Sequence, residues 1–342
     1  MDNIINCKNN RLFGVEIEVN TADGRIKKLN KNEIPLGADR VALLINKAIK
    51  KRVEIQGWDY NFHNNYWIVK PDSSCGIEIC TPVMRGWKDL KDLIQVAENL
   101  SFNNIKADHR CSLHVHVNVG DLDKNQIASI ISWYIKCEHV IMDAFPLIRK
   151  KNRYCQMIAD NDSLSVNSPL NPFFLLEKIS NIKYYTLNAY HFLKGGGFDL
   201  FNSRKKTLEF RLGENEMCLD GLSIKNWVRF LLHFVDCTKD LGLPKKYTKN
   251  DKLSGLCLLD PDDVFKILKF DKPCSKGFEQ MKLWFFERIL KFSSENSKQG
   301  VWSELARKKS RKESLNFFNN LKIKNSQKQD RNILLYHENY IE

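Results

Sequence analysis

Charged or metal-ligating side chains interrupt four otherwise apolar stretches of the sequence at every second residue. The stretches and their polar residues are FGVEIEV (13–19) with Glu16 and Glu18, GIEIC (76–80) with Glu78, LHVHV (113–117) with His114 and His116, and LEFRL (208–212) with Glu209 and Arg211. Side chains along a strand alternate between its two faces. Each stretch therefore predicts a strand with one apolar face and one face of groups that suit metal or phosphate.

The chemistry of these polar faces depends on whether they lie together. Taken singly, a strand glutamate is usually exposed to solvent, and a histidine pair usually lies on a surface. In one sheet, the carboxylates would repel each other unless cations neutralise them. Carboxylate oxygens with an occasional imidazole suit Mg²⁺ or Mn²⁺, whereas zinc would prefer more nitrogen or sulfur. The guanidinium of Arg211 suits phosphate. The combination predicts metal-assisted phosphoryl transfer from a nucleotide.

Common nucleotide-binding and hydrolase motifs are absent from the sequence. It has no GxxxxGK[ST] loop, no GxGxxG that opens a helix and no GxSxG. P-loop, Rossmann and α/β-hydrolase sites are therefore not supported. Phosphates would have to be held by metal ions and basic side chains.

The expected elements indicate an α+β fold. One further strand is expected before a turn at Pro71–Ser74, which leads into GIEIC. Helices are expected at 38–50 and 87–100, after the caps Asp123 and Asp220, and beyond Gly242, where Asp260–Pro261 form a cap and first turn. The polar stretch after the first strand, up to Gly37, reads as a loop that can act as a flap. We expect a largely antiparallel sheet with flanking helices and a helical C-terminal region.

Composition limits the class of protein. The chain has 342 residues and a net charge of +13, which favours anionic partners such as a nucleotide, an acidic peptide or nucleic acid. Residues 304–331 contain nine basic and three acidic residues, a pattern that a solvated helical face also explains. Ten cysteines without a CxxC pair predict reduced thiols. With no leader-like or membrane-spanning run, we expect a soluble, cytoplasmic protein.

A family resemblance rests on the order of the motifs. GVEIEV, KPDSSCGIEICTP, CSLHVHVNVG and TLEFRLG, together with RKKNRYC (149–155) and YYTLNAY (184–190), resemble the amidoligase family, whose relatives are glutamine synthetase and glutamate–cysteine ligase. The resemblance covers about residues 12–235. It implies a glutamine-synthetase-like sheet in a catalytic domain at 1–242. The helical region 243–342 would then serve substrate recognition or oligomerisation.

The resemblance also implies an activity and residue roles. Such enzymes activate a carboxylate with ATP as an acyl-phosphate, which an amine then attacks, and they use two or more Mg²⁺ or Mn²⁺ ions. One ion would be held by Glu16, His114 and Glu209, and the other by Glu18 and Glu78. Arg211, His116 and Glu18 would be catalytic, and Lys70 would join Arg211 and His116 in binding the nucleotide. Looser candidates for substrate or metal contacts are Asp72, Arg149, Arg153 and Asn188. The motif often has glycine where this chain has Ser112.

Other functions remain open at this point. A related phosphotransferase would phosphorylate a carboxylate or guanidine without forming an amide. A nucleic-acid-binding protein would use the basic stretch 304–331, and its affinity would collapse as salt rises. An inactive homologue is the last alternative. The carboxylate and amine substrates are not indicated by the sequence.

Overall fold

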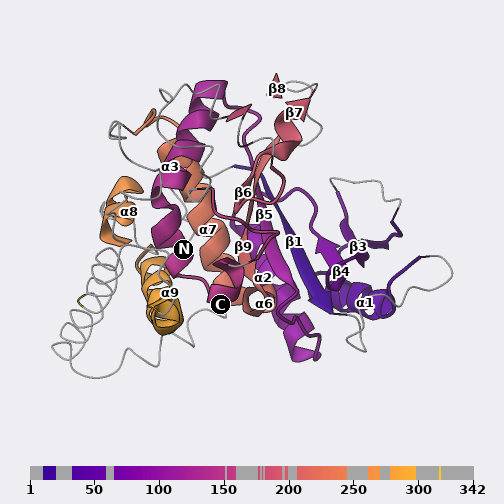
Figure 1. The fold of residues 1–342 in the computed structure, drawn as a ribbon. Helices are drawn as coiled ribbons and strands as arrows, with labels where there is room; N and C mark the ends of the chain where they lie inside the picture. Colours follow the sequence, from indigo (N-terminus) through magenta and orange to yellow (C-terminus); the bar gives the residue numbers. More distant parts are fainter. Residues whose placement is uncertain are drawn as a thin grey trace.

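A seven-stranded, mostly antiparallel sheet forms the centre of the molecule (Figure 1). This computed structural model describes residues 11–20, 33–58, 65–150, 152–158, 176–177, 179, 182–194, 197–198, 206–244, 261–269, 278–297 and 316. The strands are β1 (Phe13–Asn20), β2 (Val53–Ile55), β3 (Trp67–Asp72), β4 (Gly76–Cys80), β5 (Ser112–Asn118), β6 (Leu187–Asn188) and β9 (Thr207–Glu214). They are ordered β2-β3-β4-β1-β5-β9-β6, and only β2 and β3 run parallel. A separate hairpin joins β7 (Leu193–Lys194) and β8 (Gly197–Phe198).

Helices flank the sheet, and two of the longest begin at the predicted caps. The helices are α1 (Ala38–Ile49), α2 (Gly86–Phe102), α3 (Lys124–Asp143), α4 (Leu147–Lys150), η3 (Tyr190–Phe192), α6 (Asn215–Cys218), α7 (Gly221–Thr238), α8 (Pro261–Ile267) and α9 (Phe278–Ser297). Asp123 and Gln126 form a reciprocal capping box at the start of α3. The Asp220 carboxylate accepts from the backbone N–H groups of Leu222 and Ser223 at the start of α7.

One face of the sheet is apolar and packs against helices. Phe13, Val15 and Ile17 of β1 are fully buried, as the alternating pattern predicts. The rings of Tyr134 in α3 and Phe210 in β9 meet edge to face with their centroids 5.4 Å apart. Figure 1 shows α3 and α7 beside the strands that they cover. Burial of this face leaves the intervening polar side chains on the opposite face.

Strand register aligns those polar residues across the sheet. Side chains on directly opposite residues of paired strands share a face. The opposed pairs are Lys70–Glu78, Glu78–Glu18, Glu16–His114, His116–Glu209 and Glu209–Asn188. The four predicted strands therefore contribute to one polar surface, together with β3 and β6.

An irregularity in the β5–β9 pairing lies next to this surface. Leu113 is opposite Gly213, but Val115 is opposite Phe210, so β9 carries an extra residue. A Cβ atom on Gly213 would lie 2.5 Å from the Leu113 carbonyl oxygen. Only glycine therefore allows this close approach of the two backbones.

The coarse fold class expected from the sequence is confirmed: a mostly antiparallel sheet is combined with flanking helices. Beyond Gly242, α8 and α9 are helical. The flap prediction falls largely at 21–32, outside the described residues, and so does the basic stretch 304–331 except Asn316. The division into domains at residue 242 stays a prediction. No described helix is long and apolar enough to span a bilayer.

Candidate active site

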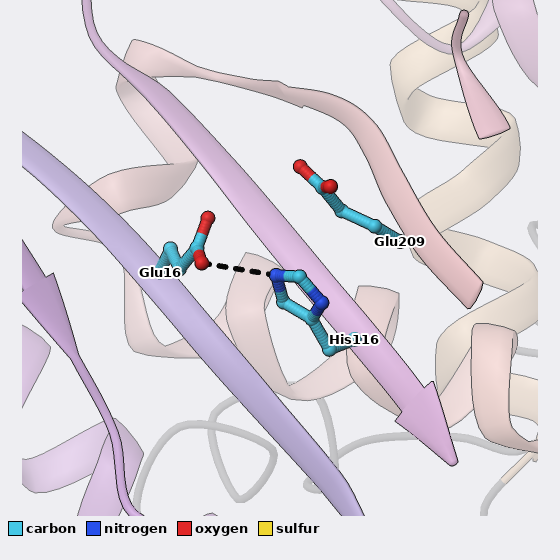
Figure 2. Close-up of side chains that lie close together, drawn as sticks. All are labelled: Glu16, His116 and Glu209. Atoms are coloured by element: carbon cyan, nitrogen blue, oxygen red, sulfur yellow. Dashed lines mark ion pairs between the residues drawn. The ribbon is translucent and has the colours of Figure 1, made fainter. Parts of the chain in front are cut away.

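Glu16, His116 and Glu209 form the first group of potential metal ligands. One ligand atom from each lies within 4.8 Å of the others. The His116 Nε2 atom is 3.1 Å from the Glu16 Oε1 atom, and Nδ1 is 3.2 Å from the Thr207 hydroxyl. Figure 2 shows the three side chains projecting toward one another from β1, β5 and β9. Two carboxylates and an imidazole are a donor set that suits Mg²⁺ or Mn²⁺.

His114 borders the same carboxylates. Its Nδ1 atom lies 3.3 Å from Glu16 Oε2 and 3.5 Å from Glu209 Oε1. Burial, helped by the charge of Arg211, lowers the pKa of His114, which favours the neutral imidazole that a metal requires. The set Glu16, His114 and Glu209 is thus brought together in space, and His116 is an equally close neighbour. The assignment of one or both imidazoles to an ion stays a prediction.

A second group consists of Glu18, Asp72 and Glu78, whose ligand atoms also lie within 4.8 Å of one another. Glu18 Oε2 accepts from the backbone N–H of Ser112 at 2.7 Å and from its hydroxyl at 2.8 Å. Asp72 Oδ1 accepts from the backbone N–H of Ser74 at 2.7 Å. These contacts fix the orientation of two of the three carboxylates.

Two carboxylates of this second group, Glu18 and Glu78, resist ionisation, whereas at Asp72 burial is outweighed by hydrogen bonds from Ser74 and Cys75, which lower its pKa. Burial, followed by the negative charge of Asp72, raises the pKa of Glu18 to about 7. Burial and the charge of Glu16 raise the pKa of Glu78. A positive ion between them would remove this penalty.

A third group joins the first two. Glu16, Glu78 and Cys80 place ligand atoms within 4.8 Å of one another, and Cys80 Sγ lies 3.0 Å from Glu78 Oε1. Glu16 belongs also to the first group and Glu78 to the second, so the ligands form one continuous cluster across the sheet. Burial raises the pKa of Cys80 well above its usual range. A protonated thiol is a poor ligand, so oxygen donors dominate.

The charges of the cluster do not balance. Five acidic residues face three basic ones, of which Lys70 and Arg149 are buried and Arg211 is half-buried; the acidic residues are Glu16, Glu18, Asp72, Glu78 and Glu209. Lys70 Nζ lies 2.6 Å from Glu78 Oε1, and Arg211 pairs with Glu209. Although burial opposes it, the Glu78 carboxylate raises the pKa of Lys70. Two negative charges remain when all groups are ionised, which is the charge that one divalent ion would neutralise.

The four looser candidates differ in their distance from the cluster. Asp72 is part of it, and Asn188 donates to Glu209 Oε2 at 2.6 Å. Arg149 is 4% exposed and donates to the backbone carbonyl of Arg211. Arg153 is exposed and lies over the Tyr154 ring, 4.7 Å from its centroid. Its guanidinium donates to the Tyr154 hydroxyl at 2.6 Å.

Sequence reasoning missed three contributors. Ser112 holds Glu18 and lies 3.0 Å from His114 Nε2, and its place two residues before His114 on the same strand face was a usable signal. Cys80 and Thr207 have the same spacing, two residues from Glu78 and Glu209 on β4 and β9, but their contacts with Glu16 and His116 depend on strand register. Ser112 stands where the family motif often has glycine, and its hydroxyl contributes a hydrogen bond that glycine lacks.

Comparisons with known proteins point to one family. Residues 9–235 match the sequence pattern of a family described as "Putative amidoligase enzyme". No curated protein sequence matches the chain.

Three solved structures are similar to the chain at low identity. A novel glutamine synthase homolog is 12% identical, with a TM-score of 0.39, over 88% of this chain and 70% of its own. A bifunctional glutathione synthetase from Pasteurella multocida is 12% identical, with a TM-score of 0.39, over 91% of this chain and 53% of its own. A glutamate–cysteine ligase from Francisella tularensis, solved in complex with AMP, is 11% identical, with a TM-score of 0.37, over 90% of this chain and 82% of its own.

Proposed function

This chain belongs to the amidoligase family, and we propose that it is an ATP-dependent ligase that joins a carboxylate to an amine through an acyl-phosphate. The observation that carries the proposal is the continuous cluster of buried and half-buried carboxylates and imidazoles on β1, β3, β4, β5 and β9. A cluster of like charges is costly in an apolar interior, so its presence favours a function that requires bound cations.

The ligand groups divide into two ion positions. Glu16 and Glu209, with His114 or His116, would hold one ion, and Glu18, Asp72 and Glu78 would hold the other. When bound, Mg²⁺ or Mn²⁺ would neutralise the phosphate oxygens and ease the departure of ADP. Ser112 and Asn188 orient one carboxylate in each position through hydrogen bonds.

Basic residues of the cluster would hold the phosphates. Arg211 contacts Glu209, which lies opposite His116, and its positive charge acts on His114. Its guanidinium is therefore placed to reach a phosphoryl group held at the first ion position. Lys70 sits beside Glu78 and would face the second. We assign nucleotide binding to these two side chains and His116.

The proposed reaction proceeds in two balanced steps. An oxygen of the substrate carboxylate attacks the γ-phosphorus of ATP, and ADP leaves. The amine then attacks the acyl carbon, phosphate leaves, and the amine loses a proton to form the amide. The enzyme supplies no nucleophile, so its residues bind, orient and neutralise charge.

The proposal is tested by ADP release. The full chain is incubated with ATP, Mg²⁺ and pools of amino acids or peptides, and ADP is measured against Glu209→Gln as the control. We expect ADP that depends on both a carboxylate and an amine and that disappears in the variant. ADP release that the variant retains in full would remove Glu209 and the first ion position from the mechanism.

A further inference from the structure

An aromatic and basic surface lies beside the candidate active site. It consists of Arg153, Tyr154, Lys183 and Tyr184, all exposed, with Tyr154 at 43% and Tyr184 at 39%. The two tyrosine rings meet edge to face with their centroids 5.2 Å apart. The Arg153 guanidinium lies 4.7 Å from the Tyr154 centroid, and the Lys183 ammonium lies 5.9 Å from the Tyr184 centroid. We call these four residues the tyrosine surface.

Backbone hydrogen bonds hold the tyrosine surface in place. The N–H of Gln156 donates to the Tyr184 carbonyl at 2.7 Å, and the N–H of Thr186 donates to the Gln156 carbonyl at 2.9 Å. The two segments thus run side by side next to β6, at the edge of the central sheet. Exposed aromatic rings on a rigid backbone are suited to recognition because little conformational entropy is lost on binding.

The tyrosine surface adjoins the phosphate-binding side of the site. Arg211 Nε donates to the Tyr154 carbonyl at 3.3 Å. An extended peptide advances about 3.3–3.6 Å per residue. A peptide bound on the tyrosine surface could therefore bring a side-chain carboxylate to Arg211 within one or two residues.

The charge of this surface selects its ligand. Among the described residues 152–158 and 182–190 there are two basic side chains, Arg153 and Lys183, and no acidic one. Surplus positive charge beside a site that activates carboxylates favours a ligand with several carboxylates. One face of the Tyr154 ring is already covered by Arg153, which hinders the base stacking that single-stranded nucleic acid uses.

We propose that the tyrosine surface binds the carboxylate substrate as an acidic peptide or acidic protein segment, rather than as a free amino acid. This inference rests on the proposed ligase function and names its substrate class. The rings would pack on the aliphatic part of the segment, and the two basic side chains would pair with its carboxylates.

Binding of fluorescein-labelled hexa-L-glutamate, followed by fluorescence anisotropy at low salt, tests the proposal. The full chain is compared with the double variant Arg153→Gln, Lys183→Gln and with Tyr184→Ala. We expect about tenfold weaker binding in the double variant, which corresponds to about 1.4 kcal/mol. Mg-ATP affinity should stay within about twofold of wild type, because the changed side chains lie outside the ligand cluster.

A matched control lies at the opposite edge of the sheet. Arg52 covers the Tyr66 ring at 4.4 Å from its centroid and is 65% exposed, and it follows α1 just before edge strand β2. Six strand spacings of about 4.8 Å separate β2 from β6, or about 29 Å. Arg52→Gln should therefore leave hexaglutamate binding unchanged.

The outcomes separate this proposal from the proposed function. Equal binding by all variants, no binding by wild type, or tighter binding of labelled hexauridylate would overturn the peptide assignment. Hydroxamate formation from free amino acids, with no binding of hexaglutamate, would support the ligase function and overturn the peptide assignment. Variant-sensitive peptide binding without any ADP release would support the tyrosine surface and contradict the ligase.

Discussion

Glu18→Gln should remove a large part of the pH dependence of stability in the metal-free protein. The pKa of Glu18 is raised from its ordinary 4.5 to about 7, because the side chain is buried and lies near Asp72. Between these two pH values the folded protein keeps the proton and the unfolded chain releases it. The unfolded chain then binds fewer protons, so stability falls as pH rises.

The size of the effect follows from the shift. One pKa unit corresponds to about 1.4 kcal/mol, so the full shift amounts to roughly 3 kcal/mol. Most of this contribution to the free energy of unfolding is lost between pH 5 and 7.5, so the wild type should lose roughly 2 kcal/mol of stability through Glu18 over that range. Glutamine cannot ionise, and its amide oxygen can still accept from Ser112. The variant should therefore be the more stable protein at pH 7.5.

Urea unfolding of both proteins in EDTA at several pH values measures this effect. Added Mg²⁺ should stabilise the wild type at pH 7.5 more than it stabilises the variant, because the ion replaces the proton. Glu216→Gln is the control for the loss of one acidic residue, since its side chain is 58% exposed and pairs with Lys291 away from the cluster. If stability depends on pH in the same way in wild type and Glu18→Gln, Glu18 does not have the raised pKa of a buried carboxylate, and the argument for a cation beside it fails.

Three further predictions concern turnover and folding. Arg211→Lys should lower turnover a hundredfold to a thousandfold, or about 3 to 4 kcal/mol, and should weaken Mg-ATP binding less, because a planar guanidinium braces the phosphoryl group in the transition state. Near-normal turnover would leave Arg211 as the partner of Glu209 only. Gly213→Ala should lower the free energy of unfolding, measured in urea, by more than about 2 kcal/mol, because the added Cβ would clash with Leu113. A decrease below about 0.5 kcal/mol would contradict the close approach of the two backbones. Asp123→Ala should cost about 1 kcal/mol of stability by removing the α3 cap, and an unchanged midpoint would show that the cap is replaced by water.

The alternating pattern was enough to predict which side chains share a face. Glu16 and Glu18, and likewise His114 and His116, lie on the polar face because their apolar neighbours are buried. The caps at Asp123 and Asp220 were also predictable, because a carboxylate before an apolar-periodic run has a local mechanism.

Pairing between strands could not be predicted in this way. β2 and β6 have only three and two residues, too few to show a period, although β6 places Asn188 on Glu209. The proximity of Asp72 to Glu18 depends on the register of β3, β4 and β1, which is settled by tertiary packing. The same holds for Cys80 opposite Glu16.

The products of ATP cleavage in the presence of hydroxylamine test the central claim most directly. The full chain is incubated with ATP, Mg²⁺, hydroxylamine and a pool of carboxylic amino acids and acidic peptides, and nucleotides and hydroxamates are quantified together. An acyl-phosphate intermediate predicts ADP, phosphate and hydroxamate in equal amounts. AMP with pyrophosphate would mean adenylation, and ADP with a stable phosphorylated product but no hydroxamate would mean a phosphotransferase; either result would contradict the proposed ligase.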